Sequence, residues 1–317
     1  MISLSELGAK LKGETKVALF CHVRPDGDTL GSALALKLAL TSLGIGAEVV
    51  CDDPVPSRFF FLNECTTVKN TLDGEYSGLI AIDCADISRL GSFGEIFSAH
   101  KNTYGIDHHI SNNRYAKYSY IVDLASNCEN ALNLIDELGV SLTEDMANLL
   151  ALGVMTDTGN FRHKNVTAET FSAASRLKAC GADINRIYYY MFSAQSKERA
   201  KLFGMVMSRI RYFENGKLAV ATVRLKDFSE SGARQDETEG FIDFVMGING
   251  VLIGACIMEV TPNKFKISFR SNGPDVNAVA STFGGGGHTL ASGCQITGDY
   301  EEVVDRVRFA SSREIPE

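Results

Sequence analysis

Short apolar runs that alternate with helical patterns dominate the first half of the chain and limit the folds it can adopt. Runs at residues 16–21, 47–51, 78–82 and 103–106 have the length and composition of buried strands. Between the first two, residues 29–43 carry apolar side chains at helical spacing and end at Gly44. This alternation predicts an α/β fold, a doubly wound parallel sheet with helices on both faces.

The pattern changes in the second half of the chain. Residues 127–208 are mostly helical, and Asn215-Gly216 then separates two strand-like runs, which indicates a hairpin. A second strand pair follows at residues 251–260 and 264–269. We therefore expect a first domain at residues 1–185, a helical connector at 186–211, and a smaller α+β domain at 212–317 that faces the first across a cleft. A length of 317 residues agrees with two domains, since single cores rarely grow beyond about 250–300 residues.

Carboxylates and imidazoles stand where the predicted strands end, which is where open parallel sheets bind ligands. The residues concerned are His22, Asp26, Asp28, Asp83, Asp107, His108 and His109, joined by Asp157 near the end of a helix that begins around residue 143. Each alone has an ordinary structural explanation; Asp28, for example, could cap the helix starting at residue 29. Together they would gather costly negative charge unless a cation were present. Oxygen and imidazole ligands suit hard divalent cations, and two such cations cleave phosphoesters.

Composition limits the substrates and the compartment. A formal net charge of -8 argues against a broad basic surface for long nucleic acid but leaves short nucleotides open. The eight cysteines are scattered without a Cys-x-x-Cys pair, so we expect reduced thiols. The first residues lack a basic start followed by an apolar stretch, and no run is long enough for a bilayer. We expect a cytoplasmic protein without a membrane partner.

The motifs resemble the DHH phosphoesterase superfamily, named for the tripeptide at residues 107–109. The likeness is closest to the two-domain nanoRNases (oligoribonucleases) that also dephosphorylate 3′-phosphoadenosine 5′-phosphate (pAp) and carry a C-terminal DHH-associated domain. Gly284-Gly285-Gly286-Gly287-His288, followed by Ala291-Ser292-Gly293, is similar to the glycine-rich motif of that domain, with one glycine more than usual. Arg270-Ser271 stands where the subfamily has a nucleotide-contacting Arg-Ser pair.

The resemblance implies a two-cation catalytic centre. His22, Asp26 and Asp83 would hold one cation, and Asp83 would be shared with a second site. That second site would be completed by Asp28, His108 and Asp157. The catalytic residues would be Asp107, which orients an imidazole, and His109, which faces the scissile phosphate. The ligand set suits Mn²⁺ best, with Mg²⁺ or Co²⁺ as substitutes.

The resemblance also implies a substrate-binding role for the second domain. Successive glycines at Gly285, Gly286 and Gly287 leave backbone N–H groups open to an anion, and Arg270, Ser271 and His288 add donors. On composition alone, a flexible turn at the glycines and a solvated Arg270 are equally consistent. Asn112, Asn113 and Arg114 follow the His pair closely enough to reach a substrate phosphate, and Arg114 is the candidate among them.

The activity implied is manganese-dependent hydrolysis of short oligoribonucleotides to mononucleotides and removal of the 3′-phosphate of pAp, by a water that bridges two divalent cations. The alternatives are hydrolysis of linear pApA made from cyclic di-AMP, an inorganic pyrophosphatase, and a non-catalytic nucleotide-binding module. The partner would be short RNA or a nucleotide, not long nucleic acid. The sequence leaves open the preferred substrate, the cleavage polarity and the oligomeric state, and it is compatible with a homodimer.

Overall fold

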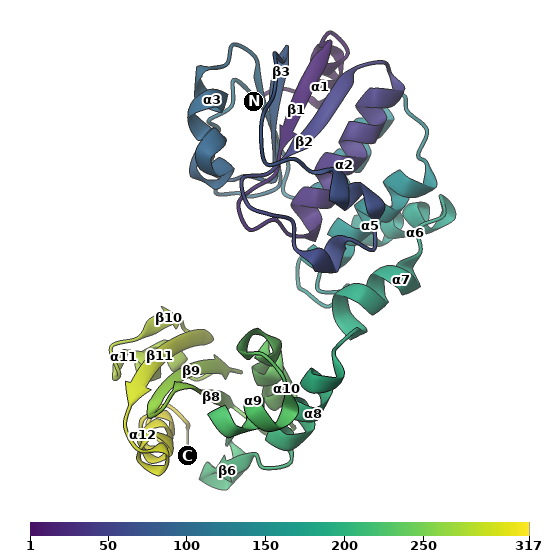
Figure 1. The fold of residues 1–317 in the computed structure, drawn as a ribbon. Coiled ribbons are helices and arrows are strands. Elements are labelled where there is room, and N and C mark those ends of the chain that lie inside the picture. Colours follow the sequence, from purple (N-terminus) through teal and green to yellow (C-terminus); the bar gives the residue numbers. More distant parts are fainter. Residues whose placement is uncertain (317) are drawn as a thin grey trace. The chain divides into compact units, whose positions relative to one another are not determined.

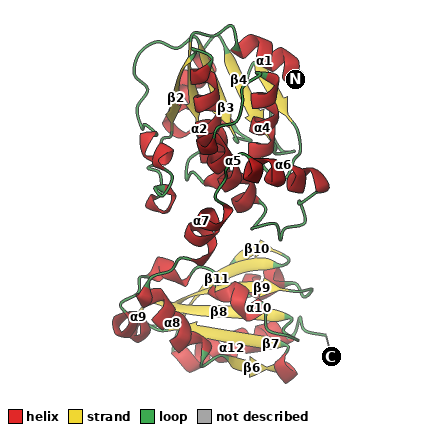
Figure 2. Cartoon of the chain, turned by 90° about the vertical axis from the view of Figure 1, so that its right-hand side faces the viewer, coloured by secondary structure: helices red, strands yellow, loops and turns green. Residues whose placement is uncertain are grey.

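The computed structural model describes residues 1–316 and divides the chain into two compact units, Met1–Ala194 and Gln195–Glu317. Each unit contains one β-sheet (Figures 1 and 2). Two clusters of buried hydrophobic residues belong to each unit. The first unit has a parallel sheet and the second a mixed sheet. The predicted α/β and α+β classes are therefore confirmed.

The sheet of the first unit has five parallel strands in the order β2-β1-β3-β4-β5. Its strands are β1 (Lys16–Phe20), β2 (Gly46–Val50), β3 (Gly78–Ile82), β4 (Thr103–Asp107) and β5 (Tyr118–Ile121). The first four occupy the runs expected from the sequence. The edge strand β5 was not predicted, because four residues that include Ser119 lack a clear apolar pattern.

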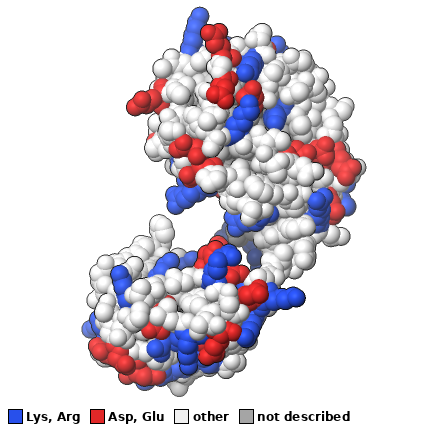
Figure 3. All heavy atoms as spheres, in the orientation of Figure 1, with Lys and Arg blue, Asp and Glu red and all other residues white. Residues whose placement is uncertain are grey.

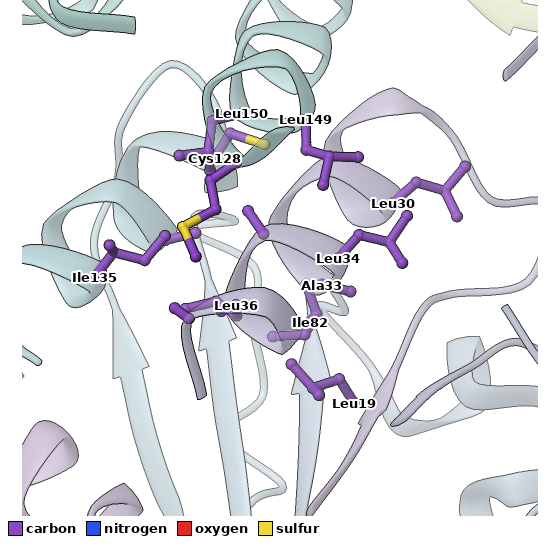
Figure 4. Packing of buried hydrophobic residues seen from close by; sticks show 14 of the residues in the cluster. Leu19, Leu30, Ala33, Leu34, Leu36, Ile82, Cys128, Ile135, Leu149 and Leu150 are labelled. Carbon is purple, nitrogen blue, oxygen red and sulfur yellow. The ribbon is translucent and has the colours of Figure 1, made fainter. Parts of the chain in front are cut away.

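Helices cover both faces of this sheet, as the doubly wound prediction requires. They are α1 (Leu4–Leu11), α2 (Gly27–Ser42), α3 (Gly94–Ala99), α4 (Asn127–Glu137), α5 (Glu144–Asp157), α6 (Ala168–Ala179) and α7 (Ile184–Tyr188), with short turns η1 (Ser57–Phe59), η2 (Asn63–Thr67), η3 (Ile87–Phe93) and the π-helical η4 (Tyr189–Ser193). Alternate residues of β1 enter separate cores: Leu19 packs beneath α2, α4 and α5, whereas Phe20 packs against Phe93 and Phe97. Figure 4 shows the first core, with Leu30 of α2 near Leu149 of α5.

Glycines allow α2 and α5 to lie close together at the end of the sheet that carries the polar clusters. A Cβ on Gly31 would stand 2.3 Å from the carbonyl oxygen of Leu149. A Cβ on Gly153 would stand 2.2 Å from Cys128 Sγ and 2.6 Å from Asp28 Oδ1. Side chains at either glycine would separate the helices, so the crossing that brings Asp28 toward the end of α5 depends on both.

The second unit is built on a six-stranded sheet in the order β10-β11-β9-β8-β7-β6, in which β7 and β8 are parallel and the other neighbours antiparallel. Its strands are β6 (Arg211–Phe213), β7 (Leu218–Val223), β8 (Ile253–Thr261), β9 (Lys264–Ser271), β10 (Gly286–His288) and β11 (Ala291–Thr297). Its helices are α8 (Lys197–Met207), α9 (Leu225–Ser231), α10 (Phe241–Met246), α11 (Val276–Ser281) and α12 (Tyr300–Ser312), with 3-10 turns η5 (Glu214–Gly216) and η6 (Gln235–Thr238).

Both predicted strand pairs of the second unit are present. In the β6–β7 hairpin, Asn215 and Gly216 have φ of 54° and 87°, the left-handed conformation that such tight turns need. The segment predicted as a connector is divided between the units, since α7 belongs to the first and α8 to the second. The residue boundaries of a three-part division remain a prediction.

The distribution of charged residues on the surface and the state of the cysteines are typical of an ordinary folded protein. On the face shown in Figure 3, Lys and Arg are interspersed with Asp and Glu on both units, without a continuous basic surface. No cysteine in residues 1–316 forms a disulfide. Within the same residues, no helix combines the length and apolar character needed to cross a membrane.

Candidate metal centre

The eight acidic and imidazole residues singled out in the sequence lie together where β1, β3 and β4 end. Their ligand atoms form three overlapping groups, within each of which all atoms lie inside 4.8 Å of one another. The groups are His22, Asp26 and Asp83; Asp28, His108 and Asp157; and Asp83, Asp107, His108 and His109. Asp157, at the end of helix α5, is the one member of these groups that does not follow a strand.

Asp83 stands between the groups. Its Oδ2 lies 3.6 Å from His22 Nε2, and its Oδ1 lies 3.4 Å from His108 Nε2 and 3.5 Å from His109 Nδ1. The residue has φ of 59°, a conformation that few non-glycine residues adopt and that turns its side chain into the centre. Asp83 Oδ1 is buried and has no hydrogen-bond partner among the described residues. A buried acceptor of this kind requires a partner.

Backbone amides fix the two carboxylates of the loop after β1. Asp26 is the N-cap of α2 and accepts hydrogen bonds from the amides of Asp28 and Thr29. Asp28 instead accepts from the amides of Asn127 and Cys128, at 2.6 Å and 2.9 Å, at the start of α4. The alternative that Asp28 simply caps its own helix is therefore wrong, because α2 starts two residues earlier than its apolar pattern indicated.

A chain of hydrogen bonds orients His109. Its Nδ1 donates to Asp107 Oδ1 at 2.8 Å, and Asn112 Nδ2 donates to Asp107 Oδ2 at 2.6 Å. Asn112 Nδ2 also donates to the carbonyl oxygen of Cys84, which links the ends of β3 and β4. The expectation that Asn112 reaches a phosphate does not hold here, since both of its amide protons are used. The sequence carried no signal for this role.

The pKa values of the histidines and aspartates reflect how closely the charged groups of the centre are packed. Burial opposes charge on His22 and His108, yet interactions of their ring N–H groups with the carboxylates of neighbouring aspartates outweigh it and raise the pKa of each imidazole to about 10. Burial and the nearby carboxylates of Asp83 and Asp157 raise the pKa of Asp28 well above its usual range. Burial, partly offset by His108, raises the pKa of Asp157 to about 6. Raised pKa values of this kind favour protonation of the ligand atoms when no cation is bound.

The donor set fits divalent cations. All of its ligand atoms are carboxylate oxygens or imidazole nitrogens, and Asp83 Oδ1 is a buried acceptor without a donor. His108 Nδ1 is 3.0 Å from the carbonyl oxygen of Leu124 and His22 Nδ1 is 2.9 Å from that of Val23, so each ring can direct Nε2 to the centre. Cations would replace the protons that these groups hold.

The substrate residues expected in the second unit lie on β9 and on the β10–β11 hairpin. Arg270 Nη1 donates to the carbonyl oxygen of Phe269, and the side chain lines a cavity of about 360 Å³ with Lys266 and Ser268. Ser271 is buried, and its Oγ accepts a hydrogen bond from the amide of Gly273. The guanidinium of Arg270 therefore retains N–H groups that can bind a ligand, whereas the hydroxyl group of Ser271 already stabilises the turn after β9.

The last three residues of the glycine-rich segment, Gly286–His288, form the short strand β10, whereas Gly284 lies in a turn. A Cβ on Gly285 would stand 2.2 Å from the carbonyl oxygen of Gly293, and one on Gly287 would stand 2.5 Å from that of Ala291. The amide of Gly287 already donates to Asn277 Oδ1 at 2.9 Å. Gly286 and His288 are exposed. In the first unit Arg114 is also exposed, and its amide donates to Asn112 Oδ1.

Comparison with known proteins agrees with this site. The model of the DHH family, N-terminal domain, matches residues 16–154, and that of the DHHA1 domain matches residues 215–313. The chain is 30% identical over 309 residues to the bifunctional oligoribonuclease and PAP phosphatase NrnA of Thermus thermophilus, covering 95% of this chain and 91% of that protein. It is 25% identical over 284 residues to the protein of the same name from Bacillus subtilis, covering 88% and 89%.

Solved structures share the fold. An exopolyphosphatase-related protein from Bacteroides fragilis aligns with a TM-score of 0.81 at 24% identity, over 98% of this chain and 96% of that one. RecJ from Thermus thermophilus in complex with Mn²⁺ aligns with a TM-score of 0.52 at 14% identity, over 99% of this chain and 55% of RecJ. The two matched domains and the 30% identical NrnA relative place the chain in the DHH family of phosphoesterases, hydrolases that act on phosphoester bonds.

Proposed function

We propose that this phosphoesterase hydrolyses short oligoribonucleotides to mononucleotides and removes the 3′-phosphate of pAp. The observation that carries the proposal is the pair of ligand groups that meet at Asp83, one with His22 and Asp26, the other completed by Asp28, His108 and Asp157. The names of the relatives, which cover nearly the full chain, support the choice of substrates. Mn²⁺ is the preferred ion, because the ligands are carboxylates and imidazoles.

The chain's own residues then have distinct tasks. When bound, a pair of divalent cations lowers the pKa of water and neutralises charge on phosphoryl oxygens. Asp107 holds the proton of His109 on Nδ1 or stabilises the imidazolium, so that the other ring nitrogen can face the reacting phosphate. The hydrogen bond that His109 donates to Asp107, only partly opposed by burial, raises the pKa of His109 above its ordinary value. His109 can therefore donate a proton or a hydrogen bond near neutral pH.

The second unit supplies the contacts to the rest of the nucleotide in this proposal. Arg270 offers guanidinium N–H groups to a phosphate, and Gly286 and His288 add exposed donors on β10. Ser271, Gly285 and Gly287 shape the backbone around them. Arg114 of the first unit is a further candidate for a phosphate contact, because it is exposed and no carboxylate pairs with it among residues 1–316.

The test is a substrate panel with Mn²⁺: pAp, pApA, a 5-mer RNA and pyrophosphate, with products separated by chromatography. We expect AMP and phosphate from pAp and mononucleotides from the RNA, with pyrophosphate left intact. The Asp83→Asn variant, which keeps the side chain's size, is the matched inactive control. Preferential cleavage of pyrophosphate would assign the chain to a different activity of the fold, and exclusive cleavage of pApA would restrict it to linear dinucleotides.

A further inference from the structure

Arg89 borders the metal centre and has no role in the site described so far. It lies on η3, the 3-10 turn that follows β3, and its Nη2 is 2.8 Å from His22 Nδ1. The carbonyl oxygen of Arg89 accepts a hydrogen bond from the amide of Val23 at 2.8 Å. This backbone hydrogen bond holds Arg89 beside the loop after β1, independently of the conformation of its side chain.

The guanidinium of Arg89 lacks an anionic partner. Among residues 1–316, no carboxylate lies within 4.0 Å of it, and His22 Nδ1 is its single polar contact. Arg176 and Arg224, by contrast, are paired with Asp136 and Glu259. The Arg89 guanidinium lies against a histidine of the metal centre and pairs with no carboxylate among residues 1–316, which leaves its remaining N–H donors free.

The contact with His22 does not supply Arg89 with an acceptor, because His22 Nδ1 is shared with the carbonyl oxygen of Val23, to which only a protonated Nδ1 can donate. His22 Nε2 is the atom that faces the centre, 3.4 Å from Asp26 Oδ2 and 3.6 Å from Asp83 Oδ2. Binding through Nε2 requires the ring proton on Nδ1, where it donates to the carbonyl oxygen of Val23 at 2.9 Å. Two donors then face each other, and no other acceptor for the Arg89 guanidinium is found among residues 1–316.

We propose that Arg89 is a further catalytic residue, which binds the phosphate undergoing hydrolysis. The inference rests on the proposed function, since it supposes a phosphoester at the metal centre. A planar guanidinium can donate two parallel hydrogen bonds to phosphoryl oxygens, where negative charge builds up during the reaction. Because Arg89 lies beside the centre itself, it serves every substrate, including esters that lack a nucleotide.

The experiment compares Arg89→Ala and Arg89→Lys with Arg58→Ala. Arg58 is a matched control: it also lies on a short 3-10 turn of the first unit and has no carboxylate partner there, but no described contact links it to the centre. Turnover of pAp and of p-nitrophenyl phosphate is measured with Mn²⁺. Binding of AMP and of Mn²⁺ is measured by calorimetry, and thermal unfolding verifies that each variant folds.

We expect Arg89→Ala to lower kcat/KM by about 10- to 150-fold on both substrates, the loss associated with a hydrogen bond to a charged group. Arg89→Lys should retain part of the activity, Arg58→Ala should match the wild type, and added guanidinium should restore part of the Arg89→Ala activity. AMP should bind the alanine variant more weakly, while Mn²⁺ affinity stays unchanged or rises, because a nearby positive charge is gone.

Two results would overturn the inference. Wild-type turnover and AMP binding in Arg89→Ala would show that the residue does not contact phosphate. Weaker Mn²⁺ binding by Arg89→Ala would show that it holds His22 in place instead. If the wild-type protein hydrolyses no phosphoester, the proposed function fails, and the AMP titration still decides whether Arg89 binds phosphate.

Discussion

Loading the metal centre with Mn²⁺ should expel protons from the protein. In the absence of cations, interactions with the carboxylates of Asp26 and Asp83, acting against burial, raise the pKa of His22 to about 10, and Asp83 and Asp28 do the same for His108. Both imidazoles are therefore charged at pH 7.5 and must lose a proton before Nε2 can bind a cation. Their side chains are only 4% and 12% exposed, so solvent screens these interactions little.

The free-energy cost of deprotonating each imidazole follows from the difference between its pKa and the pH of the experiment. At pH 7.5, deprotonating a group with a pKa of about 10 costs about 3 kcal/mol, at 1.36 kcal/mol per unit. We expect about two protons released per protein from His22 and His108, and any proton held by Asp28 adds to them. Below pH 10 the affinity for Mn²⁺ should rise about tenfold per pH unit for each proton displaced.

Calorimetry in buffers of different ionisation enthalpy counts these protons directly. Titrations at pH 6.5, 7.5 and 8.5 should give the predicted release and a steep increase in affinity. Release of less than about one proton per protein, or an affinity independent of pH, would contradict the raised pKa values of the two imidazoles.

The same shifts fix how the stability of the cation-free protein depends on pH. A histidine whose pKa is raised in the folded state stabilises that state fully below its unfolded pKa of 6.5, and this stabilisation is lost as the pH rises toward about 10. The cation-free first unit should therefore lose stability across this range. Excess Mn²⁺ should offset the loss, because it binds the folded state alone.

Three further predictions concern single residues. Asp83→Asn should lower kcat/KM by more than tenfold, over about 1.4 kcal/mol in the barrier, and weaken Mn²⁺ binding measured by calorimetry; retention of a tenth of the activity would exclude a shared ligand. Arg270→Ala should lower turnover of pAp by about 10- to 150-fold and leave p-nitrophenyl phosphate unaffected, whereas equal losses in the two assays would place Arg270 in the catalytic centre or in the fold. Burial raises the pKa of Asp227, but Arg209 and backbone donors outweigh it and lower that pKa, so Asp227→Asn should destabilise the second unit by about 1–3 kcal/mol in urea unfolding at pH 7. The difference from wild type should shrink as the pH falls below about 4, and a constant difference would exclude the ion pair as its cause.

The sequence was most informative where topology alone decides the outcome. In a parallel sheet, residues that follow each strand meet at one edge, so His22, Asp83 and Asp107 could be placed together without knowing any side-chain contact. The hairpin at Asn215-Gly216 was predictable for a similar reason, since its turn needs left-handed residues. These features depend on local pattern and on the order of the strands.

Features that depend on tertiary packing could not be predicted. Asp28 accepts hydrogen bonds from residues about 100 positions away, which no local pattern encodes. The side chains of Asn112 and Arg89 each have partners from another strand end. The last three residues of the glycine-rich segment form a strand although glycine disfavours that conformation, because pairing of Gly286 with Gly293 of β11 overrides local preference.

The central claim is that two cations share Asp83, and anomalous diffraction tests it most directly. A crystal of the protein grown with Mn²⁺, measured at the manganese absorption edge, should show two anomalous peaks. One should lie beside His22 and Asp26, the other beside Asp28, His108 and Asp157, with Asp83 bound to both. A single peak, or a pair of which only one contacts Asp83, would contradict the shared carboxylate.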